Sequence, residues 1–237
     1  MPASLGPFDV AVQRDLWAPM RDGVRLAADL YRPLRDGRVI KEALPVLLER
    51  TPYDKADRDR SQRDRLFASH GYAVVVQDCR GCYASGGDLD FLAQEPQDGY
   101  DTVEWIAAQP WCDGKVGMFG TSYLGWTQSA AATQNPPHLA CIFPSMSGWN
   151  AHASSVRQGG AMELRFIAWA FWHAALNSNK RLKEQPWVAK GLNDVDFRHW
   201  LTRLPLRPGG SPLSLAPSYQ RWALELFDHG DYDEFWK

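Results

Sequence analysis

The sequence predicts an α/β protein with a mainly parallel sheet, an antiparallel hairpin at one edge of that sheet, and a helical region at the C-terminal end. Three observations predict this fold. Residues 9–32 alternate apolar and polar positions around a turn, short apolar runs then alternate with helix-compatible segments up to residue 148, and residues 149–237 are rich in aromatic side chains. Alternation of buried strands with helices is typical of a doubly wound sheet.

The strands are predicted from two different patterns. Asp9–Trp17 and Val24–Arg32 flank the turn Met20–Gly23, which predicts a hairpin at the sheet edge. The strands of the parallel sheet are predicted at continuously apolar runs rich in branched residues: Leu44–Leu48, Tyr72–Val76, Val116–Phe119 and Leu139–Phe143. Such runs indicate strands that are buried on both faces.

Helices are predicted between and after these strands. They are expected at Arg60–His70, at Asp98–Gln109, from the turn at Ser122 to Gln134, at Met162–Leu176 and at Tyr219–Phe227. The Pro-, Gly- and Ser-rich stretch Pro205–Pro217 predicts a linker. The change in composition near Gly148 predicts two domains, a core over residues 1–148 and a helical cap over residues 149–237.

Charge and hydropathy argue against several classes of partner. The 26 Lys and Arg residues nearly balance the 28 Asp and Glu residues, for a net charge of -2, so nothing favours binding to nucleic acid or to an anionic membrane. The longest apolar run, Phe166–Trp172, is too short to span a bilayer, and Met1–Met20 lacks the pattern of a secretion signal. We expect a cytoplasmic protein that uses no cofactor.

Cys79 and Cys82 have the Cys-x-x-Cys spacing of thiol-redox and metal sites. Cys112 and Cys141 are isolated, and no second close pair completes a tetrahedral metal site. We expect free thiols, and a thiol-redox module stays open as an alternative.

Ser122 lies where an apolar run meets a turn of small residues and a helix-compatible segment, within Gly117–Gly125. A serine hydroxyl is a poor nucleophile unless the backbone presents it to a base and to donors for an oxyanion, and a sharp strand-to-helix turn achieves this presentation. The segment departs from the Gly-x-Ser-x-Gly pattern because Leu124 follows Tyr123. The pattern therefore predicts a nucleophilic serine at position 122.

Several motifs occur together in one order along the chain: Arg50–Lys55, Gln77–Gly81 with Ser85-Gly86, Trp111–Gly117 and Gly120–Gly125. In this order they resemble the X-Pro dipeptidyl-peptidase and cocaine esterase family of serine hydrolases, and Asp231–Trp236 resembles the end of that family's helical cap. The resemblance implies an α/β-hydrolase fold with Ser122 as nucleophile. It also implies an oxyanion hole made by the Tyr53 hydroxyl and the backbone N–H of Tyr123.

In that family the catalytic acid and base follow the cap, and no residues here match their positions. The resemblance therefore implies a fold that is incomplete at the C-terminus, impaired activity, and an uncovered sheet edge that favours self-association. Among the histidines that follow Ser122, His152 is the least implausible substitute base, but no acid precedes it in the required order.

The expected substrate is a small ester or a short peptide, and ester and amide are not distinguished. Trp149, Trp169 and Trp172 are candidates for an apolar acyl pocket, although aromatic residues at helical spacing more often belong to a core. Asp78 and Arg80 are expected to pair with each other and hold the loop Gly81–Gly87. The alternative function is a catalytically silent ligand-binding module on the same fold.

Overall fold

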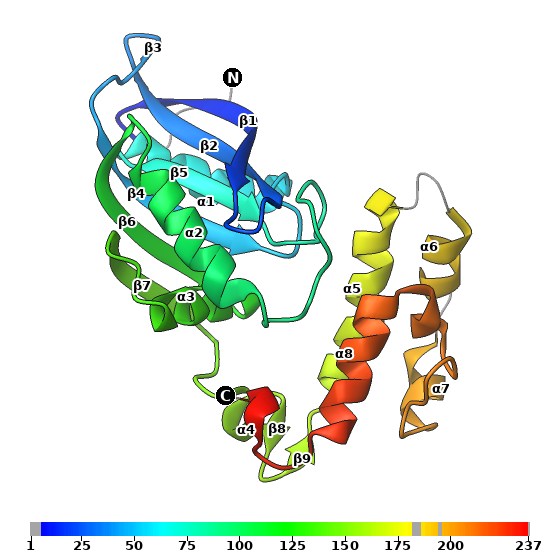
Figure 1. The fold of residues 1–237 in the computed structure, drawn as a ribbon. Helices are drawn as coiled ribbons and strands as arrows, with labels where there is room; N and C mark the ends of the chain where they lie inside the picture. The colour runs from blue at the N-terminus through cyan, green and yellow to red at the C-terminus, as the bar shows by residue number, and fades with distance from the viewer. Residues whose placement is uncertain (1–5, 182–185, 194–195, 237) are drawn as a thin grey trace. The chain divides into compact units, whose positions relative to one another are not determined.

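The computed structural model describes residues 6–181, 186–193 and 196–236 (Figure 1). The chain forms two compact units: Met1–Asp88 with Leu92–Ser147, and Leu89–Phe91 with Gly148–Lys237. The first unit is built on a sheet, and the second is mostly helical. The grouping of Leu89–Phe91 with the second unit had no counterpart in the sequence pattern.

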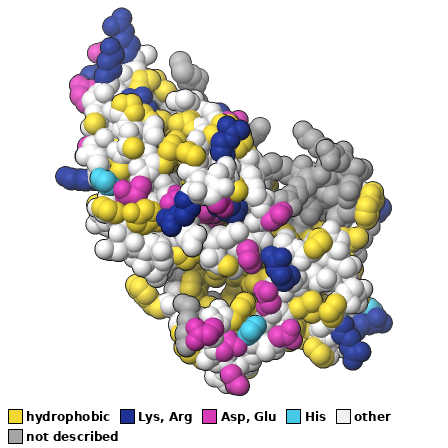
Figure 2. All heavy atoms as spheres, viewed as in Figure 1, with side chains coloured by type: hydrophobic (Ala, Val, Ile, Leu, Met, Phe, Trp, Pro, Cys, Tyr) yellow, Lys and Arg dark blue, Asp and Glu magenta, His cyan; other side chains and the backbone are white. Residues whose placement is uncertain are grey.

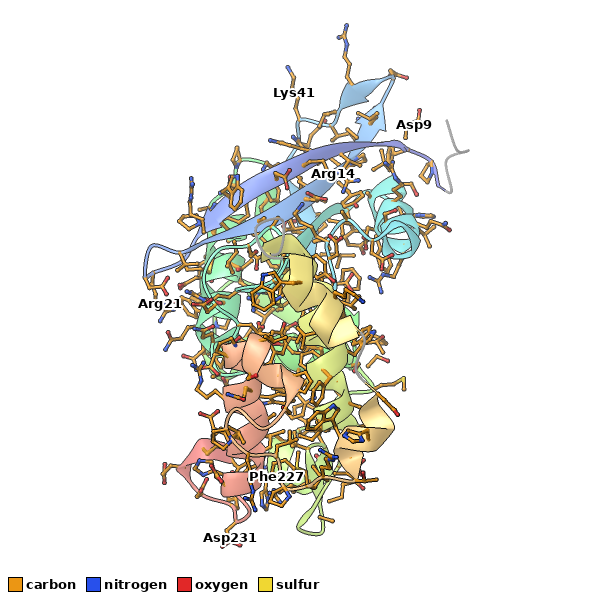
Figure 3. All side chains as sticks on the ribbon, turned by 90° about the vertical axis from the view of Figure 1, so that its right-hand side faces the viewer. Asp9, Arg14, Arg21, Lys41, Phe227 and Asp231 are labelled. Carbon is orange, nitrogen blue, oxygen red and sulfur yellow. The ribbon has the colours of Figure 1, made fainter. Side chains whose placement is uncertain are left out.

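The N-terminal hairpin is present as predicted. Strand β1 (Asp9–Pro19) pairs antiparallel with β2 (Arg25–Arg35), and the short strand β3 (Arg38–Val39), which was not predicted, also pairs with β2. Figure 3 shows Arg21 at the turn of this hairpin and Arg14 within β1. The β1–β2 register shifts between Gln13 and Leu16, so β1 contains one extra residue there, a β-bulge.

The remaining strands form the predicted parallel part of the sheet. They are β4 (Leu44–Thr51), β5 (Ala73–Asp78), β6 (Cys112–Thr121) and β7 (Leu139–Ser145). The strand order is β1-β2-β5-β4-β6-β7, with β2 antiparallel to β5 and every later pair parallel. This order confirms the predicted fold class. Within the described residues, β7 pairs with β6 alone and forms an edge of the sheet.

Helices cover both faces of the sheet because the strands are apolar on both faces (Figure 1). Helix α1 (Arg58–Ser69) packs with Val74 and Val76 of β5, whereas α2 (Glu95–Ala107) and α3 (Tyr123–Thr133) cover the other face, where Ala73 and Val75 lie. Successive residues of one strand therefore supply two separate hydrophobic cores, as the two-residue period of a strand requires.

The chain reverses its direction of winding beside β4. After β4 it places β5 on one side, and after β5 it crosses to place β6 on the other side. The carboxyl ends of the parallel neighbours β4 and β6 therefore meet at a topological switch point, where open α/β sheets form their ligand sites. Tyr53 follows β4 and Ser122 follows β6, so both sequence-predicted groups lie at this point.

The second unit contains short helices around two longer ones. Its elements are α4 (Ala151–Ser154), β8 (Arg157–Gln158), β9 (Ala161–Met162), α5 (Arg165–Arg181), α6 (Pro186–Asn193), α7 (Phe197–Leu201), η1 (Pro212–Leu215), α8 (Pro217–Asp228) and η2 (Glu234–Trp236). Helices α5 and α8 correspond to the two predicted helices and pack against each other. The linker prediction for 205–217 was wrong at its end, because η1 forms a 3₁₀ turn and buries Leu213 completely.

Basic and acidic side chains both occur across the visible face of the molecule (Figure 2). In the part of the chain that the structure describes, none of the helices has the length and hydropathy to cross a membrane.

Candidate active site

Ser122 has the backbone geometry of a strained turn. It separates β6 from α3, and its φ of 62° and ψ of -120° lie where few residues other than glycine are found. The Ser122 N–H donates to Ser145 O of β7 at 2.9 Å, and Ser122 O accepts from Gly125 N at 2.8 Å. The side chain is exposed, and among the described residues its hydroxyl makes no hydrogen bond. The turn therefore presents the hydroxyl to solvent at the carboxyl edge of the sheet.

Two glycines explain the departure from the common motif. A Cβ on Gly120, which has a φ of 144°, would lie 2.5 Å from Leu124 Cβ, and a Cβ on Gly125 would lie 2.7 Å from Ser147 Cβ. The close approach of α3 to the end of β7 occurs at position 125. A glycine is therefore required three residues after the serine, and Leu124 is tolerated at the second position.

Tyr53 lies beside this turn. Its ring meets the ring of Tyr123 edge-on, with 6.3 Å between centroids and an interplanar angle of 73°. The Tyr53 N–H donates to Thr51 Oγ1 at 3.0 Å, which fixes the start of the loop after β4. Tyr123 occupies the first turn of α3, where backbone N–H groups have no partner within the helix. The residues proposed for the oxyanion hole are thus neighbours in space.

The Tyr123 side chain points into a buried charged cluster. Its hydroxyl donates to Glu95 Oε1 at 3.1 Å, and Glu95 forms an ion pair with Arg50, which is fully buried. Burial, followed by the charge of Glu95, raises the pKa of Tyr123 well above its ordinary value, so the hydroxyl stays a donor. The sequence reasoning missed Arg50 and Glu95 as anchors of the turn. Glu49 and Arg50 follow the apolar run Leu44–Leu48 from which the strand was predicted, so no local signal marked Arg50 as buried.

The expected pairing of Asp78 with Arg80 was wrong. Arg80 Nη2 binds Asp98 Oδ1 at 2.6 Å and Arg80 Nη1 binds Asp22 Oδ2 at 2.7 Å, which joins the start of α2 to the turn of the hairpin. Asp78 instead accepts hydrogen bonds from two backbone N–H groups, those of Lys55 at 2.7 Å and Ala84 at 3.0 Å.

The histidines considered as substitute bases are engaged elsewhere. His152 Nε2 lies 3.0 Å from Gly230 O, and its ring contacts Tyr232 and Trp236. His229 Nδ1 lies 2.6 Å from Asp233 Oδ2, so His229 pairs with an acid that follows it by four residues. Of the others, His138 bonds to Glu104, His173 bonds to the Tyr219 hydroxyl, and the His199 ring meets the Trp200 ring edge-on. In the described part of the chain, none of these histidines hydrogen-bonds to Ser122.

The three tryptophans proposed for an acyl pocket have different surroundings. Trp169 stacks on His173 with 4.5 Å between centroids and meets Trp222 edge-on at 5.6 Å. Trp172 is 45% exposed and Trp149 is 80% exposed. Among the described residues no ring contact joins Trp149 to Trp169 or Trp172. Trp169 is therefore part of a packed aromatic cluster, and the other two present rings to solvent.

Thiol and metal chemistry find no support in the geometry. Cys79 and Cys82 are fully buried free thiols, and burial raises the pKa of Cys79 well above its ordinary value, the reverse of an activated redox thiol. The described residues contain no group of three or more His, Cys, Asp or Glu side chains arranged to hold a metal ion.

The strand order, the helices on both faces and the serine turn after β6 define an α/β-hydrolase fold. The model of the X-Pro dipeptidyl-peptidase (S15) family matches residues 22–237, and the chain belongs to this family. A cocaine esterase of Rhodococcus sp. (strain MB1 Bresler) is 39% identical to it over 243 residues, which cover 96% of this chain and 40% of the esterase. The chain thus spans less than half the length of that relative.

Solved structures share the fold at lower identity. An aminopeptidase from the marine sediment archaeon Thaumarchaeota archaeon has a TM-score of 0.65 and 23% identity, over 100% of this chain and 40% of that one. An α-amino acid ester hydrolase has a TM-score of 0.64 and 23% identity, over the same shares of the two chains. These likenesses support the architecture and confirm the predicted fold.

Proposed function

We propose that this chain carries the nucleophile and the oxyanion donors of a serine hydrolase that cleaves ester or amide bonds of small acyl or peptidyl substrates. The observation that supports this most is the exposed Ser122 on a strained turn whose following residue, Tyr123, has its ring against the ring of Tyr53. Strain of about 1–3 kcal/mol at a residue other than glycine persists only where the surrounding structure enforces it, and such strain concentrates at reactive sites.

The chemistry follows from these groups. Ser122 Oγ attacks the substrate carbonyl carbon and loses its proton to a base, while the carbonyl oxygen gains negative charge. The Tyr53 O–H and the Tyr123 backbone N–H donate hydrogen bonds to that oxygen. Collapse of the intermediate expels an alcohol or amine and leaves an acyl-serine, which water hydrolyses.

The proposal includes slow turnover by this chain, because no histidine in its described part hydrogen-bonds to Ser122. With an activated ester such as p-nitrophenyl acetate, we expect release of p-nitrophenolate near the background rate. A stoichiometric burst that disappears in Ser122→Ala would show that a base does act on Ser122, and would contradict this part of the proposal.

The nucleophile position can be tested without a base. A Ser122→Cys variant in a Cys141→Ser background supplies a thiol that ionises at pH 9 by itself, and Cys141 is the one exposed native cysteine. Acylation by p-nitrophenyl acetate passes through an oxyanion, whereas alkylation by iodoacetamide does not, so the ratio of the two rates reports the oxyanion donors. Both reactions need the thiolate, and its abundance cancels in the ratio.

The matched control is Thr133→Cys, an exposed position at the other end of α3. We expect the acylation-to-alkylation ratio at position 122 to exceed that at position 133 by ~10²-fold, the lower end of the effect of one oxyanion donor. Tyr53→Phe should lower the ratio at position 122 alone. Equal ratios at the two positions would overturn the proposed site.

We also propose that the chain self-associates through β7. This strand is an edge of the sheet in the described residues, and Phe143 in it is 74% exposed. Light scattering after size exclusion should show dimers or larger species that Phe143→Lys reduces. A monomer at all concentrations would contradict the proposal.

A further inference from the structure

The loop Tyr53–Lys55 is fixed at its far end by Asp78. Asp78 is the last residue of β5 and lies opposite Thr51, the last residue of β4, in the parallel register. Its Oδ1 accepts from Lys55 N at 2.7 Å, and its Oδ2 accepts from Ala84 N at 3.0 Å. The side chain is fully buried; its hydrogen bond from Lys55 is shielded from water, and that from Ala84 is partly shielded. One carboxylate therefore joins the loop after β4 to the loop after β5.

A second set of contacts fixes the Lys55 side chain. Lys55 Nζ donates to Asp29 Oδ1 at 2.8 Å and to Asp15 Oδ1 at 2.7 Å, so it is held by both strands of the N-terminal hairpin. Between Tyr53 and Lys55, Asp54 has a φ of 75°, a region that aspartate enters more readily than most residues other than glycine. The position of the loop therefore depends on the groups that hold Lys55.

We propose that Asp78 is a positioning residue that aims the Tyr53 hydroxyl at the oxyanion, acting through the backbone of Lys55. This inference rests on the proposed function. Asp78 is fully buried, and in the described residues its side chain accepts from the backbone of Lys55 and Ala84 and makes no hydrogen bond to Ser122. A carboxylate suits this position because it accepts two N–H donors without offering a donor of its own. An asparagine would accept from one N–H group and turn its amide N–H₂ toward the other.

The test uses Asp78→Asn in the Ser122→Cys, Cys141→Ser background at pH 9, with the acylation-to-alkylation ratio as readout. We expect a ~10-fold lower ratio, because a small misplacement of a donor weakens the stabilisation of the oxyanion while leaving the thiol accessible to iodoacetamide. Alkylation should change little.

The matched control is Asp113→Asn. Asp113 also accepts a backbone N–H, from Lys115 at 3.0 Å, and the substitution removes the same charge at the opposite end of β6. The ratio should not change in this variant. An equal loss in Asp113→Asn and Asp78→Asn would overturn the inference, since the effect would then follow from charge or stability.

A double variant separates action through Tyr53 from other effects. If Asp78 acts by aiming Tyr53, Asp78→Asn should lower the ratio no further in a Tyr53→Phe background. If Asp78→Asn lowered the ratio by the same factor in the Tyr53→Phe background, Asp78 would act through a group other than Tyr53, and the inference would be overturned. If Tyr53→Phe itself has no effect, the proposed oxyanion donor is wrong. If Tyr53→Phe lowers the ratio and Asp78→Asn does not, only the positioning role is wrong.

A measurement on the unsubstituted chain covers the case in which Asp78→Asn does not fold. A backbone N–H bonded to a buried carboxylate is protected from solvent exchange. The Lys55 amide should therefore exchange at least ~10-fold more slowly than the amide of Ala56 in the same loop, whose hydrogen bond to Asp54 Oδ1 at 2.9 Å is exposed to solvent. Exchange of both amides at the same rate would overturn the inference.

Discussion

Tyr53 and Tyr123 in the first unit are held through hydrogen bonds to charged groups, whereas Trp169 and Trp222 in the second unit are held by ring packing. Glu95 accepts from the Tyr123 hydroxyl, and Asp78 binds the loop of Tyr53. Trp222 meets Trp169 edge-on and lies 4.0 Å from Phe91 between ring centroids. A hydrogen bond restricts the orientation of the group that it holds, whereas packing restricts mainly the volume of the side chain. An oxyanion donor must point at one oxygen atom, which is a physical reason for holding Tyr53 and Tyr123 through hydrogen bonds to charged groups.

The largest expected effect is the loss of the buried cation. Arg50→Met leaves Glu95 buried without its partner, and we expect the first unit to lose ~3–5 kcal/mol of unfolding free energy. Hydrogen-exchange mass spectrometry can follow peptides of the two units separately, which matters because two units need not unfold in one step. Arg50→Met with Glu95→Gln should recover part of the loss. A loss below ~1 kcal/mol in the single variant would contradict the importance of this ion pair.

A slightly smaller effect is expected in the aromatic cluster. Trp222 is 4% exposed, and Trp222→Ala should destabilise the second unit by ~3 kcal/mol, the lower end for a buried aromatic residue. Trp222→Phe should lose less than half as much, because another ring fills most of the volume.

Arg50→Lys should lose most of what Arg50→Met loses, because a lysine cannot reproduce the geometry of the guanidinium. If Trp222→Phe and Arg50→Lys each kept the same share of the unfolding free energy lost in Trp222→Ala and Arg50→Met, the two units would not differ in how they hold these side chains.

The next effect is a dependence of stability on pH. Burial raises the pKa of Asp78 from 3.8 to about 7 and Asp54 adds to this, while the Ala84 and Lys55 amides and the Lys55 charge oppose it. Because the pKa of Asp78 is higher in the folded than in the unfolded state, its favourable contribution to the free energy of unfolding is complete below about pH 4. This contribution decreases as the pH rises to about 7, and it does not change further above that pH. The change is of the order of a few kcal/mol.

Denaturation curves at several pH values would measure this change. Asp78→Asn should lack this part of the pH dependence, and the difference in unfolding free energy between the two proteins should vary only between about pH 4 and 7. A difference that is constant with pH would mean that Asp78 ionises normally.

The smallest effect concerns Ser122 itself. Ser122→Gly should raise the unfolding free energy by ~1 kcal/mol relative to Ser122→Ala, because glycine adopts a positive φ without strain. Both variants lack the hydroxyl, so their difference isolates the backbone. If Ser122→Gly were the less stable of the two, the turn would not be strained.

The sequence predicted the strands and the reactive turn because local patterns determine both. Continuous apolar runs mark β5 and β6 within a few residues, and Ser122 is found from small residues close to it in the chain. Arg80 shows where prediction failed. Its partners Asp22 and Asp98 lie 58 and 18 residues away, and only the folded sheet brings them together.

The same limit applies to the anchors of the proposed oxyanion hole. Glu95 reaches Tyr123 across 28 residues, and Asp78 reaches Lys55 across 23. The residues around Asp78 do not indicate whether its carboxylate binds Arg80, its neighbour in sequence, or a backbone N–H of an adjacent loop. Arg50 is fully buried, but it lies beyond the apolar run Leu44–Leu48, so its burial too appears only in the folded sheet.

The bulge in β1 has a consequence for the evolution of chain length in the hairpin. The additional residue lets Asp15 leave the regular pleat, with a φ of 54°, and reach Lys55 while Val10 and Val12 still face α1. Deleting one residue there would turn that end of the strand over and expose both valines to water. We therefore expect an insertion or deletion in this hairpin to be tolerated mainly when a second one restores the original number of residues in β1.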